Sequence, residues 1–299
     1  MKELVIISGK GGTGKTSVAA CFGVLAQRAV MTDCDVDAAD LHLLLQPEIL
    51  LRRDFSGGHR AIIRTENCNA CGTCFNLCRF AAVIPDGEKY RIDPIACEGC
   101  GVCSHFCPEK AIDCQPVING QWFLSKTRIG PMVHARLGIA QENSGKLVTL
   151  LRNQAKGLAR EHSRDLLIID GSPGTGCPVI ASLTGADLVL AVTEPTLSGH
   201  HDLLRVIDLA GHFGAPLAVC VNKWDLNPET TLKIENHARS LGLPVVGRIR
   251  YDRSVTEAQI RQQTLVEFTT GGAAGDIRRL WDDIAELLDG TPPDLMVTN

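Results

Sequence analysis

The chain of 299 residues lacks a long hydrophobic run, an excess of positive charge and a recognisable leader. No apolar stretch approaches the roughly 20 residues that cross a bilayer, so stable membrane insertion is not expected. The formal net charge is −4 at pH 7, which gives no reason to expect nucleic-acid binding. The first residues resemble a strand rather than a signal peptide with a cleavage region. Together these absences predict a cytoplasmic protein.

Cysteine, by contrast, is abundant, with 13 residues. The odd number, the tight clustering and the expected compartment favour metal ligation over disulfides. Eight of them form two runs, "CNACGTCFNLC" and "CEGCGVCSHFC", each spaced C-x2-C-x2-C-x3-C. This is the bacterial pattern for two [4Fe–4S] clusters, in which the fourth cysteine of each run ligates the other cluster. The expected ligands are Cys68, Cys71, Cys74 and Cys107 for one cluster and Cys97, Cys100, Cys103 and Cys78 for the second.

Two four-cysteine zinc sites are the alternative, but zinc ribbons separate their cysteine pairs by long spacers. The runs differ where Cys78 is followed by Arg79 and Cys107 by Pro108. Because proline fixes the direction of the chain, we expect two different cluster environments, with Arg79 raising the potential of one cluster. Most of the remaining cysteines are expected to be buried small apolar groups. They are Cys21, Cys34, Cys114, Cys177 and Cys220.

Outside the cysteine runs, short apolar segments alternate with helical periodicity, as at residues 3–8, 165–171, 187–194 and 216–223. Buried strands separated by helices predict a doubly wound, mostly parallel α/β sheet that is covered on both faces. From about residue 55 to residue 115 the chain is rich in Gly, Pro, Asn and paired cysteines instead. We therefore predict a P-loop domain over residues 1–54 and 116–299, interrupted by a small ferredoxin-like α+β domain over residues 55–115.

The segment "GKGGTGKT" fits G-x-x-x-x-G-K-[ST] between a predicted strand and a predicted helix. Backbone N–H groups of such a loop converge on phosphate oxygens, and the helix N-terminus adds positive potential. Lys15 should reach the β- and γ-phosphates, and the Thr16 hydroxyl should hold Mg²⁺. A glycine-rich turn that binds nothing is the alternative. The residues expected to bind nucleotide and magnesium are Gly9, Lys10, Gly11, Gly12, Thr13, Gly14, Lys15, Thr16 and Ser17.

A phosphate cradle does not need the additional lysine, Lys10, that follows the first glycine. With it, "GKGGTGKT" resembles the deviant Walker A motif of the MinD, ParA, Mrp and nitrogenase-iron-protein family. In that family the early lysine reaches the nucleotide of the other subunit. The resemblance implies a nucleotide-dependent homodimer, or a heterodimer with a related ATPase, that binds ATP or ADP with Mg²⁺. It further implies slow ATP hydrolysis that a partner stimulates.

The same resemblance assigns roles to acids at strand ends. "DCDVDAADLH" resembles switch I, in which Asp35 orients the attacking water and Asp33 belongs to the magnesium shell. "LLIIDGSPGTG" resembles Walker B and switch II, with Asp170 on the metal side and Gly174 following the γ-phosphate. Solvated strand ends or helix caps are the alternative for these acids. The catalytic residues that the resemblance implies are Lys10, Lys15, Asp35 and Asp170.

Two further motifs are less specific. "VCVNKWD" resembles the family's base-recognition motif, with Asn222 hydrogen-bonding adenine, although in N-K-x-D of GTPases the aspartate, here Asp225, reads guanine. Cys177 stands where the nitrogenase iron protein, which this region resembles, ligates a cluster shared across its dimer. His134 is the ligand-type side chain at the place of the expected second cysteine. A packed cysteine and a surface histidine are the alternative.

Both modules together resemble MinD-family ATPases with an inserted two-cluster ferredoxin domain, which implies an anaerobic prokaryote as the source. The favoured function is an ATPase switch coupled to electron transfer through two [4Fe–4S] clusters to an unidentified redox partner. One alternative is an iron–sulfur carrier or scaffold of the Mrp type, although eight regular cysteines indicate permanent ligation. The other is a MinD- or ParA-like positioning switch with redox sensing. The amphipathic segment 275–290 is net acidic, unlike a membrane-binding tail.

Overall fold

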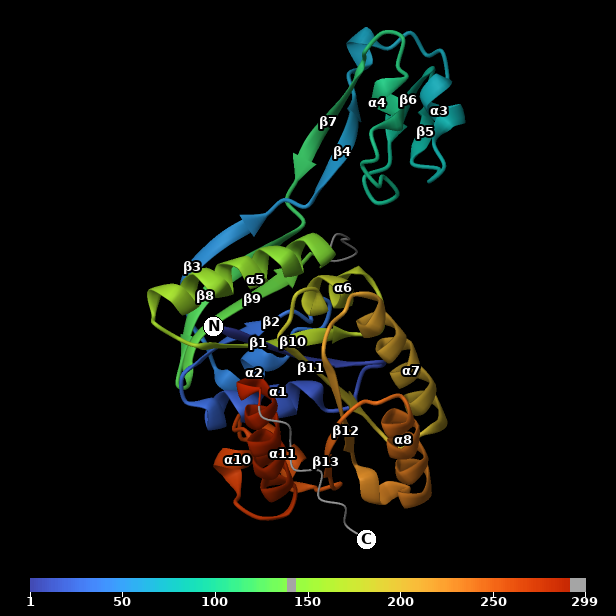
Figure 1. The fold of residues 1–299 in the computed structure, drawn as a ribbon. Coiled ribbons are helices and arrows are strands. Elements are labelled where there is room, and N and C mark those ends of the chain that lie inside the picture. The colour runs from blue at the N-terminus through green and yellow to red at the C-terminus, as the bar shows by residue number, and fades with distance from the viewer. Residues whose placement is uncertain (139–143, 291–299) are drawn as a thin grey trace. The chain divides into compact units, whose positions relative to one another are not determined.

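The computed structural model of the protein describes residues 1–138 and 144–290 (Figure 1). The chain forms two compact units. The first unit comprises Met1–Arg52, Trp122–Arg136 and the chain from Ser144 onward. The second, here called the cysteine-bearing unit, comprises Arg53–Gln121 together with Leu137 and Gly138. Both cysteine runs and the whole of the predicted insertion, residues 55–115, lie in the cysteine-bearing unit.

A nine-stranded sheet forms the centre of the first unit, in the order β13-β12-β11-β1-β10-β2-β9-β8-β3 (Figure 1). Each neighbouring pair from β13 to β9 is parallel. The predicted mostly parallel α/β sheet is therefore confirmed. The strands of its central part are β1 (Lys2–Ser8), β2 (Ala29–Asp33), β10 (Leu166–Pro173), β11 (Leu188–Thr193), β12 (Leu217–Asn222) and β13 (Val245–Ile249).

The sequence did not reveal the edge of this sheet, which consists of β9 (Gly130–Leu137), β8 (Gly120–Thr127) and β3 (Glu48–Phe55). β8 and β9 are joined by two residues, so this pair runs antiparallel. The Thr127 hydroxyl closes the turn by donating to the Gly130 carbonyl oxygen at 2.8 Å. β3 is largely exposed, and an edge strand without a buried apolar run leaves little trace in the sequence.

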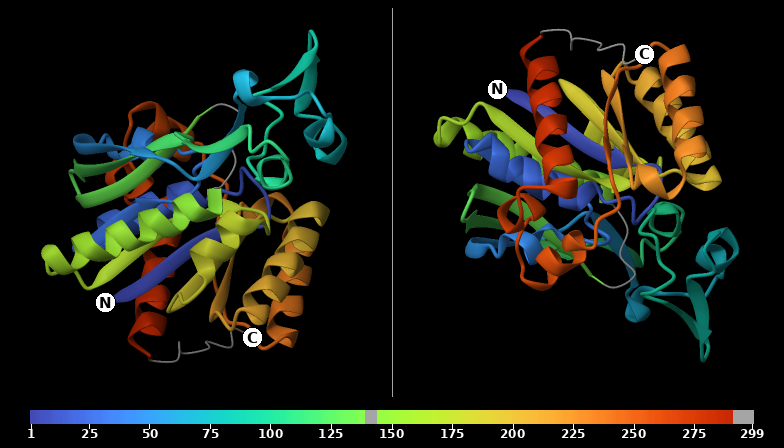
Figure 2. Two further views of the ribbon diagram at one scale, coloured as in Figure 1. Left: turned by 90° about the horizontal axis from the view of Figure 1, so that it is seen from above. Right: turned by 90° about the horizontal axis from the view of Figure 1, so that it is seen from below.

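Helices cover both faces of the sheet (Figures 1 and 2). One face carries α1 (Lys15–Ala26), α2 (Leu41–Leu45), α9 (Ser254–Ile260), α10 (Leu265–Phe268) and α11 (Gly272–Asp289). The other carries α5 (Ser144–Glu161), α6 (Cys177–Leu183), α7 (Leu197–His212) and α8 (Pro228–Ser240). The short 3₁₀ helix η2 (Trp224–Leu226) precedes α8. No helix in residues 1–138 and 144–290 is long and apolar enough to span a membrane.

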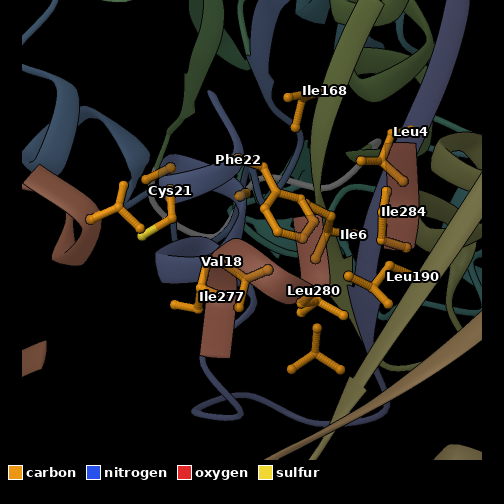
Figure 3. Packing of buried hydrophobic residues seen from close by; sticks show 14 of the residues in the cluster. Leu4, Ile6, Val18, Cys21, Phe22, Ile168, Leu190, Ile277, Leu280 and Ile284 are labelled. Atoms are coloured by element: carbon orange, nitrogen blue, oxygen red, sulfur yellow. The ribbon is translucent and has the colours of Figure 1, made fainter. Parts of the chain in front are cut away.

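Successive side chains of β1 point to opposite faces of the sheet, so this strand contributes to the packing on both faces. Leu4 and Ile6 belong to the core beneath α1 and α11, where they pack with Phe22 and Ile284 (Figure 3). Phe22 also meets Trp281 of α11, with ring centroids 5.1 Å apart. All these strand residues are fully buried, as expected for a parallel sheet covered on both faces. The rigid β1 delivers the loop that follows it to the carboxyl edge of the sheet.

The cysteine-bearing unit has a small core of its own. β4 (Gly58–Ile63) pairs antiparallel with β7 (Ile112–Val117), and β5 (Val83–Asp86) pairs antiparallel with β6 (Lys89–Ile92). The 3₁₀ helix η1 (Thr65–Asn67) and two short helices, α3 (Thr73–Leu77) and α4 (Val102–His105), complete the unit. Its buried centre consists of Ala61, Cys74, Val83 and Ile112. With so few buried side chains, the unit needs additional cross-links to be stable on its own.

Arg152 of α5 ties together three elements of the first unit. Its guanidinium donates to the Glu3 carboxylate of β1 at 2.6 Å and to the carbonyl oxygens of Ala181 and Thr184 at 2.7 and 2.9 Å. The Glu3 carboxylate also pairs with Lys156 at 2.6 Å. Arg152 and Glu3 are buried, whereas the Lys156 side chain is 30% exposed. Arg152 therefore fixes α6, and with it the chain segment that follows β10.

Replacing Arg152 with methionine is expected to lower the free energy of unfolding by about 2–4 kcal/mol. The substitution leaves Glu3 with one partner and removes the donor of two carbonyl groups. Lys156→Met, which breaks the more exposed half of the same network, should cost about 1 kcal/mol or less. Urea unfolding of both variants checks this, and equal losses would contradict the central place of Arg152.

Candidate nucleotide site and cysteine cavities

The loop between β1 and α1, residues Gly9 to Gly14, has the shape of an anion cradle. Gly12 and Gly14 adopt left-handed φ angles of 80° and 93°, which favour glycine. A Cβ atom at Gly14 would in addition collide with the Asn222 amide. Gly14 begins α1 without a side-chain cap, so the first N–H groups of the helix have no side-chain partner. Such groups, together with the positive end of the helix dipole, bind phosphate.

Lys15, the first residue of α1, is buried against carboxylates. Its Nζ atom lies 2.5 Å from Oδ2 of Asp35, and both side chains are more than nine-tenths buried. Burial lowers the pKa of Lys15, but the charges of Asp170 and Asp35 outweigh burial and raise it. Burial likewise raises the pKa of Asp35, and Lys15 opposes that rise. Asp35 thus forms an ion pair with the ammonium group that the sequence assigns to phosphate.

Asp33 and Asp170 lie side by side, because they are partners in the parallel pairing of β2 and β10. Asp33 accepts hydrogen bonds from the N–H groups of Asp35 and Leu41, at 3.1 and 3.0 Å. It thereby holds both ends of the loop between β2 and α2. Burial and the neighbouring Asp170 raise the pKa of Asp33 well above its ordinary value.

Neither carboxylate oxygen of Asp170 has a hydrogen-bond partner, although the side chain is fully buried. Burial raises the pKa of Asp170 to about 6, while Lys15 and the nearby Thr16 hydroxyl lower it. The Thr13 hydroxyl is also buried without a partner. An unpartnered carboxylate beside a threonine hydroxyl and a phosphate loop suits Mg²⁺, which prefers oxygen ligands. The predicted magnesium ligands Thr16 and Asp170 therefore fit the ion.

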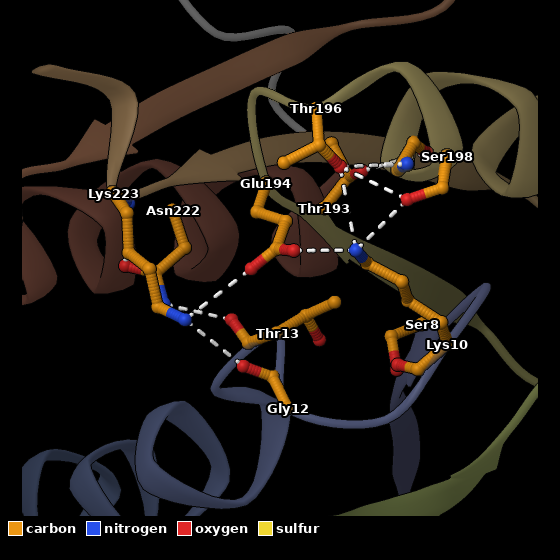
Figure 4. A network of polar contacts seen from close by, with 11 residues as sticks. Ser8, Lys10, Gly12, Thr13, Thr193, Glu194, Thr196, Ser198, Asn222 and Lys223 are labelled. Carbon is orange, nitrogen blue, oxygen red and sulfur yellow. Dashed lines mark hydrogen bonds and ion pairs between the residues drawn. The ribbon is translucent and has the colours of Figure 1, made fainter. Parts of the chain in front are cut away.

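A polar network holds the outer side of the phosphate loop (Figure 4). Asn222, at the end of β12, donates to the Thr13 carbonyl oxygen at 2.7 Å, and Lys223 donates to that of Gly12 at 3.1 Å. These two successive carbonyl groups thus point toward Asn222 and Lys223 and away from the cradle. Lys223 also pairs with Glu194 at 3.3 Å, and Glu194 pairs with Lys10 at 2.5 Å. The amide of Asn222, predicted to bind a base, here supports the loop.

A cavity of about 260 Å³ opens beside this loop. Gly12, Gly14, Ser17 and Asn222 line one side, and the segment after β13 lines the other. The lining residues of that second side include Ile249, Arg250, Tyr251, Asp252, Val255, Thr256 and Gln259. This volume suits a nucleoside. The sequence did not reveal the segment after β13, because it contains no motif; only its position at the carboxyl end of a parallel strand could have indicated it.

The remaining predicted residues of the first unit make separate contacts. Gly174 has a left-handed φ of 91° and donates its N–H to the Ser8 carbonyl at 2.8 Å. Ser17 accepts a hydrogen bond from Gln259 at 3.2 Å. The expected burial of other cysteines is confirmed for Cys21, Cys34 and Cys220.

The alternative of a packed Cys177 and a surface His134 is wrong on both counts, and the ligand role of Cys177 stays a prediction. Cys177 is exposed at the start of α6. His134 is buried in β9 between Phe123 and His42, with ring centroids 4.9 and 6.5 Å away. Its Nε2 atom lies 3.0 Å from the Ser125 hydroxyl, and burial lowers its pKa to about 4. Because β8 and β9 were not predicted, the burial of this residue was not expected.

The repeat of the two cysteine runs is also a repeat of backbone geometry. Ala70 and Gly99 occupy equivalent positions and have φ angles of 57° and 64°. Gly72 and Gly101, again equivalent, precede α3 and α4 with φ angles of 73° and 77°. The fourth cysteines also match, since the Ala82 and Ala111 N–H groups each lie 3.3 Å from Sγ of the cysteine four residues earlier. Two equal loops thus present their thiols in the same way.

The thiols line two separate cavities. One, of about 430 Å³, is lined by Cys78, Cys97, Cys100 and Cys103 together with Arg79. The other, of about 20 Å³, is lined by Cys68, Cys71, Cys74 and Cys107 together with Pro108. Among the described residues, no three His, Cys, Asp or Glu side chains converge as ligands of a single metal ion do. The chemistry of each donor set, four thiols, is that of an iron–sulfur cluster site.

Comparison with known proteins gives a family match over residues 4–266, to the CobQ/CobB/MinD/ParA nucleotide-binding domain. An uncharacterized protein of Methanocaldococcus jannaschii, MJ0578, is 34% identical over 230 residues, which is 75% of this chain and 79% of that protein. A second uncharacterized protein of the same organism, MJ0579, is 25% identical over 293 residues, 95% and 98% of the two chains. The indolepyruvate oxidoreductase subunit IorA of Archaeoglobus fulgidus is 48% identical over 48 residues, 16% of this chain and 8% of that subunit.

Solved structures show the same fold. The MinD cell division protein of Aquifex aeolicus superposes with a TM-score of 0.58 at 19% identity, covering 95% of this chain and 97% of that one. The septum site-determining protein MinD of Pyrococcus horikoshii, complexed with Mg-ADP, superposes with a TM-score of 0.57 at 15% identity, covering 96% of both chains.

Asp170→Asn is expected to stabilise the nucleotide-free protein at pH 7 and above. The pKa of the wild-type carboxyl is about 6 in the fold and ordinarily 3.8, so the folded state binds the proton more tightly. The resulting destabilisation develops between about pH 4 and pH 6 and reaches about 1–3 kcal/mol above that range. Urea unfolding without Mg²⁺ at pH 4, 5.5 and 7.5 checks this. A variant that is less stable than wild type at pH 7.5 would contradict it.

Proposed function

Because the chain belongs to the CobQ/CobB/MinD/ParA family of nucleotide-binding domains, we propose that it is an ATPase switch coupled to electron transfer. The observation that carries this proposal is the presence of two kinds of site in one chain. A phosphate loop with a buried lysine and three aspartates lies in the first unit. Two four-cysteine cavities lie in the cysteine-bearing unit.

The surroundings of Asp225 and the presence of Lys10 favour ATP over GTP. Asp225, the residue that would read guanine in N-K-x-D, accepts a hydrogen bond from the Tyr251 N–H at 2.7 Å. It is not among the residues that line the cavity beside the loop. Lys10, the mark of the deviant Walker A motif, belongs to the same loop. The carboxylate that does line the cavity, Asp252, already accepts hydrogen bonds from Ser254 and from the Ala273 N–H, so it is not free to read guanine.

Hydrolysis requires Lys15 to change its partner. Phosphate oxygens in the cradle compete with Asp35 for the Lys15 ammonium, which now lies 2.5 Å from that carboxylate. Once released, Asp35 is free to orient the attacking water, as the resemblance implies. Thr16 and Asp170 would hold Mg²⁺, which would neutralise charge on the phosphates. Lys10 would complete the site of a second subunit, so that hydrolysis depends on a dimer of this chain or with a related ATPase.

Each set of four cysteines in the cysteine-bearing unit would hold one [4Fe–4S] cluster. The cavity of about 430 Å³ has room for a cluster, whereas the cysteines around the cavity of about 20 Å³ would have to move apart to take one. When bound, the clusters supply one-electron transfer. Backbone N–H groups directed at Sγ of Cys78 and Cys107 stabilise thiolate charge. The short match to an oxidoreductase subunit supports a redox role. The electron acceptor would be an unidentified redox protein.

Protein purified without oxygen should contain close to eight iron atoms per chain, because two four-iron clusters are proposed. Cys100→Ser should reduce the iron content by about half, since it removes a ligand of one cluster. Cys177→Ser, which removes an exposed thiol outside both cavities, is the matched control and should keep all eight atoms. Iron and zinc are measured together by mass spectrometry. Two zinc atoms per chain would refute the cluster assignment.

Binding of ATP should change the rate at which dithionite reduces the clusters, measured by stopped-flow absorbance. ADP should not reproduce the change, and Asp35→Asn, which binds ATP without hydrolysing it, should show it without decay. Identical rates in all nucleotide states would remove the coupling. Transfer of iron to an apo-ferredoxin under the same conditions would instead favour the carrier function.

A further inference from the structure

The Glu194 carboxylate lies between two lysines of the nucleotide site. Oε1 is 2.5 Å from Nζ of Lys10, and Oε2 is 3.3 Å from Nζ of Lys223 (Figure 4). The Glu194 side chain is 17% exposed, and the two lysines are 28% and 30% exposed. Burial raises the pKa of Glu194, but hydrogen bonds from Lys10 and Lys223 outweigh burial and lower it. The carboxylate is therefore charged and fully engaged within one chain.

Lys10 has no other acidic partner in the part of the chain that the structure describes. Its ammonium also donates to the hydroxyl groups of Thr196 and Ser198, at 3.3 and 3.1 Å. These three acceptors occupy all three hydrogens of the ammonium group. In this arrangement Lys10 contacts only its own chain, whereas the proposed dimer needs the same ammonium at the nucleotide of the partner subunit.

The turn that carries Glu194 is rigid. The Thr196 hydroxyl accepts the Gly199 N–H at 2.9 Å and caps α7, and the Thr193 hydroxyl donates to the Gly199 carbonyl at 3.0 Å. A Cβ atom at Gly199 would collide with the Glu194 carbonyl oxygen. Glu194 is thus held at a fixed place at the end of β11, and the flexible partner in the ion pair is Lys10.

Release of Lys10 would not leave a charge without a partner. Lys223 would still pair with Glu194, and Lys223 is itself fixed by the Gly12 carbonyl oxygen. The change therefore exchanges one partly exposed ion pair for a contact with phosphate. Partly exposed pairs are weak, so the release of Lys10 from Glu194 costs little free energy. This is the property of a two-state element that a ligand can bias.

We propose that Glu194 is a positioning residue that retains Lys10 within its own subunit and so opposes formation of the nucleotide-bound dimer. This rests on the proposed function, because it assumes that Lys10 acts across a dimer. When the dimer forms, Lys10 leaves the carboxylate of Glu194 in its own chain and pairs with the phosphates of the other subunit's nucleotide. Glu194 then sets the protein concentration at which the switch assembles.

The test compares dimerisation of four variants by sedimentation at saturating, slowly hydrolysed ATP analogue. Glu194→Gln should lower the dimer dissociation constant by about three- to thirty-fold, because a dimer of this chain releases two partly exposed ion pairs, one in each subunit. Lys10→Ala should weaken the dimer, and the double variant Lys10→Ala/Glu194→Gln should match Lys10→Ala, because Glu194 acts through Lys10. Glu229→Gln, which breaks the exposed pair with Lys233, is the matched control and should behave as wild type.

Each result is decisive in a different way. If neither wild type nor Glu194→Gln dimerises with the analogue, the proposed dimer and the inference about Glu194 both fail. If wild type dimerises and Glu194→Gln does not strengthen the dimer, the inference is wrong and the proposed function stands. If the double variant dimerises better than Lys10→Ala, Glu194 acts by general electrostatics and not through Lys10, which also overturns the inference. Analogue affinity of the isolated subunits, measured by calorimetry below the dimerisation range, should agree within about two-fold.

Discussion

The nucleotide site depends on one electrostatic constraint, the burial of two aspartates at adjacent ends of parallel strands. Burial raises the pKa of both, and the charge of Asp170 adds to the effect on Asp33. Asp33 is compensated by two backbone N–H groups. Asp170 has no such hydrogen bonds, and the buried Lys15 nearby is already paired with Asp35. The Asp170 carboxylate therefore has no hydrogen-bond partner among the described residues, and Mg²⁺ is suited to supply the missing positive charge.

Much of this site could be predicted from the sequence, because parallel strands bring their carboxyl ends to one edge. The phosphate loop, Asp33 and Asp170 each follow a short apolar run, and the sheet gathers them. The contact between Lys10 and Glu194 could not be predicted, since it joins distant segments that meet only through the order of β1 and β11. Nor could the burial of His134, because β8 and β9 form a hairpin without a strong turn motif or a continuous apolar run.

In the cysteine-bearing unit the spacing of the cysteines predicted which thiols line the same cavity, but it did not predict the surroundings of those thiols. The exchange of the fourth cysteines, inferred from C-x2-C-x2-C-x3-C, agrees with the lining of the two cavities, but the difference in cavity size was not foreseen. The residues around the two cavities differ, with Arg79 in the lining of the larger cavity and Pro108 in that of the smaller one. Side-chain packing around a repeat is not itself repeated, so motif spacing carries no information about it.

The link between the two kinds of site is covalent and short. Asp33 holds the N–H groups of Asp35 and Leu41, so the loop that contains Asp35 is anchored at both ends. α2 begins at Leu41, β3 follows from Glu48, and the cysteine-bearing unit begins at Arg53. In the proposed function, release of Asp35 by Lys15 alters a loop whose far end leads through α2 into β3. In that proposal the Lys15 ammonium, which would exchange Asp35 for phosphate, is the two-state element through which nucleotide binding would bias the clusters.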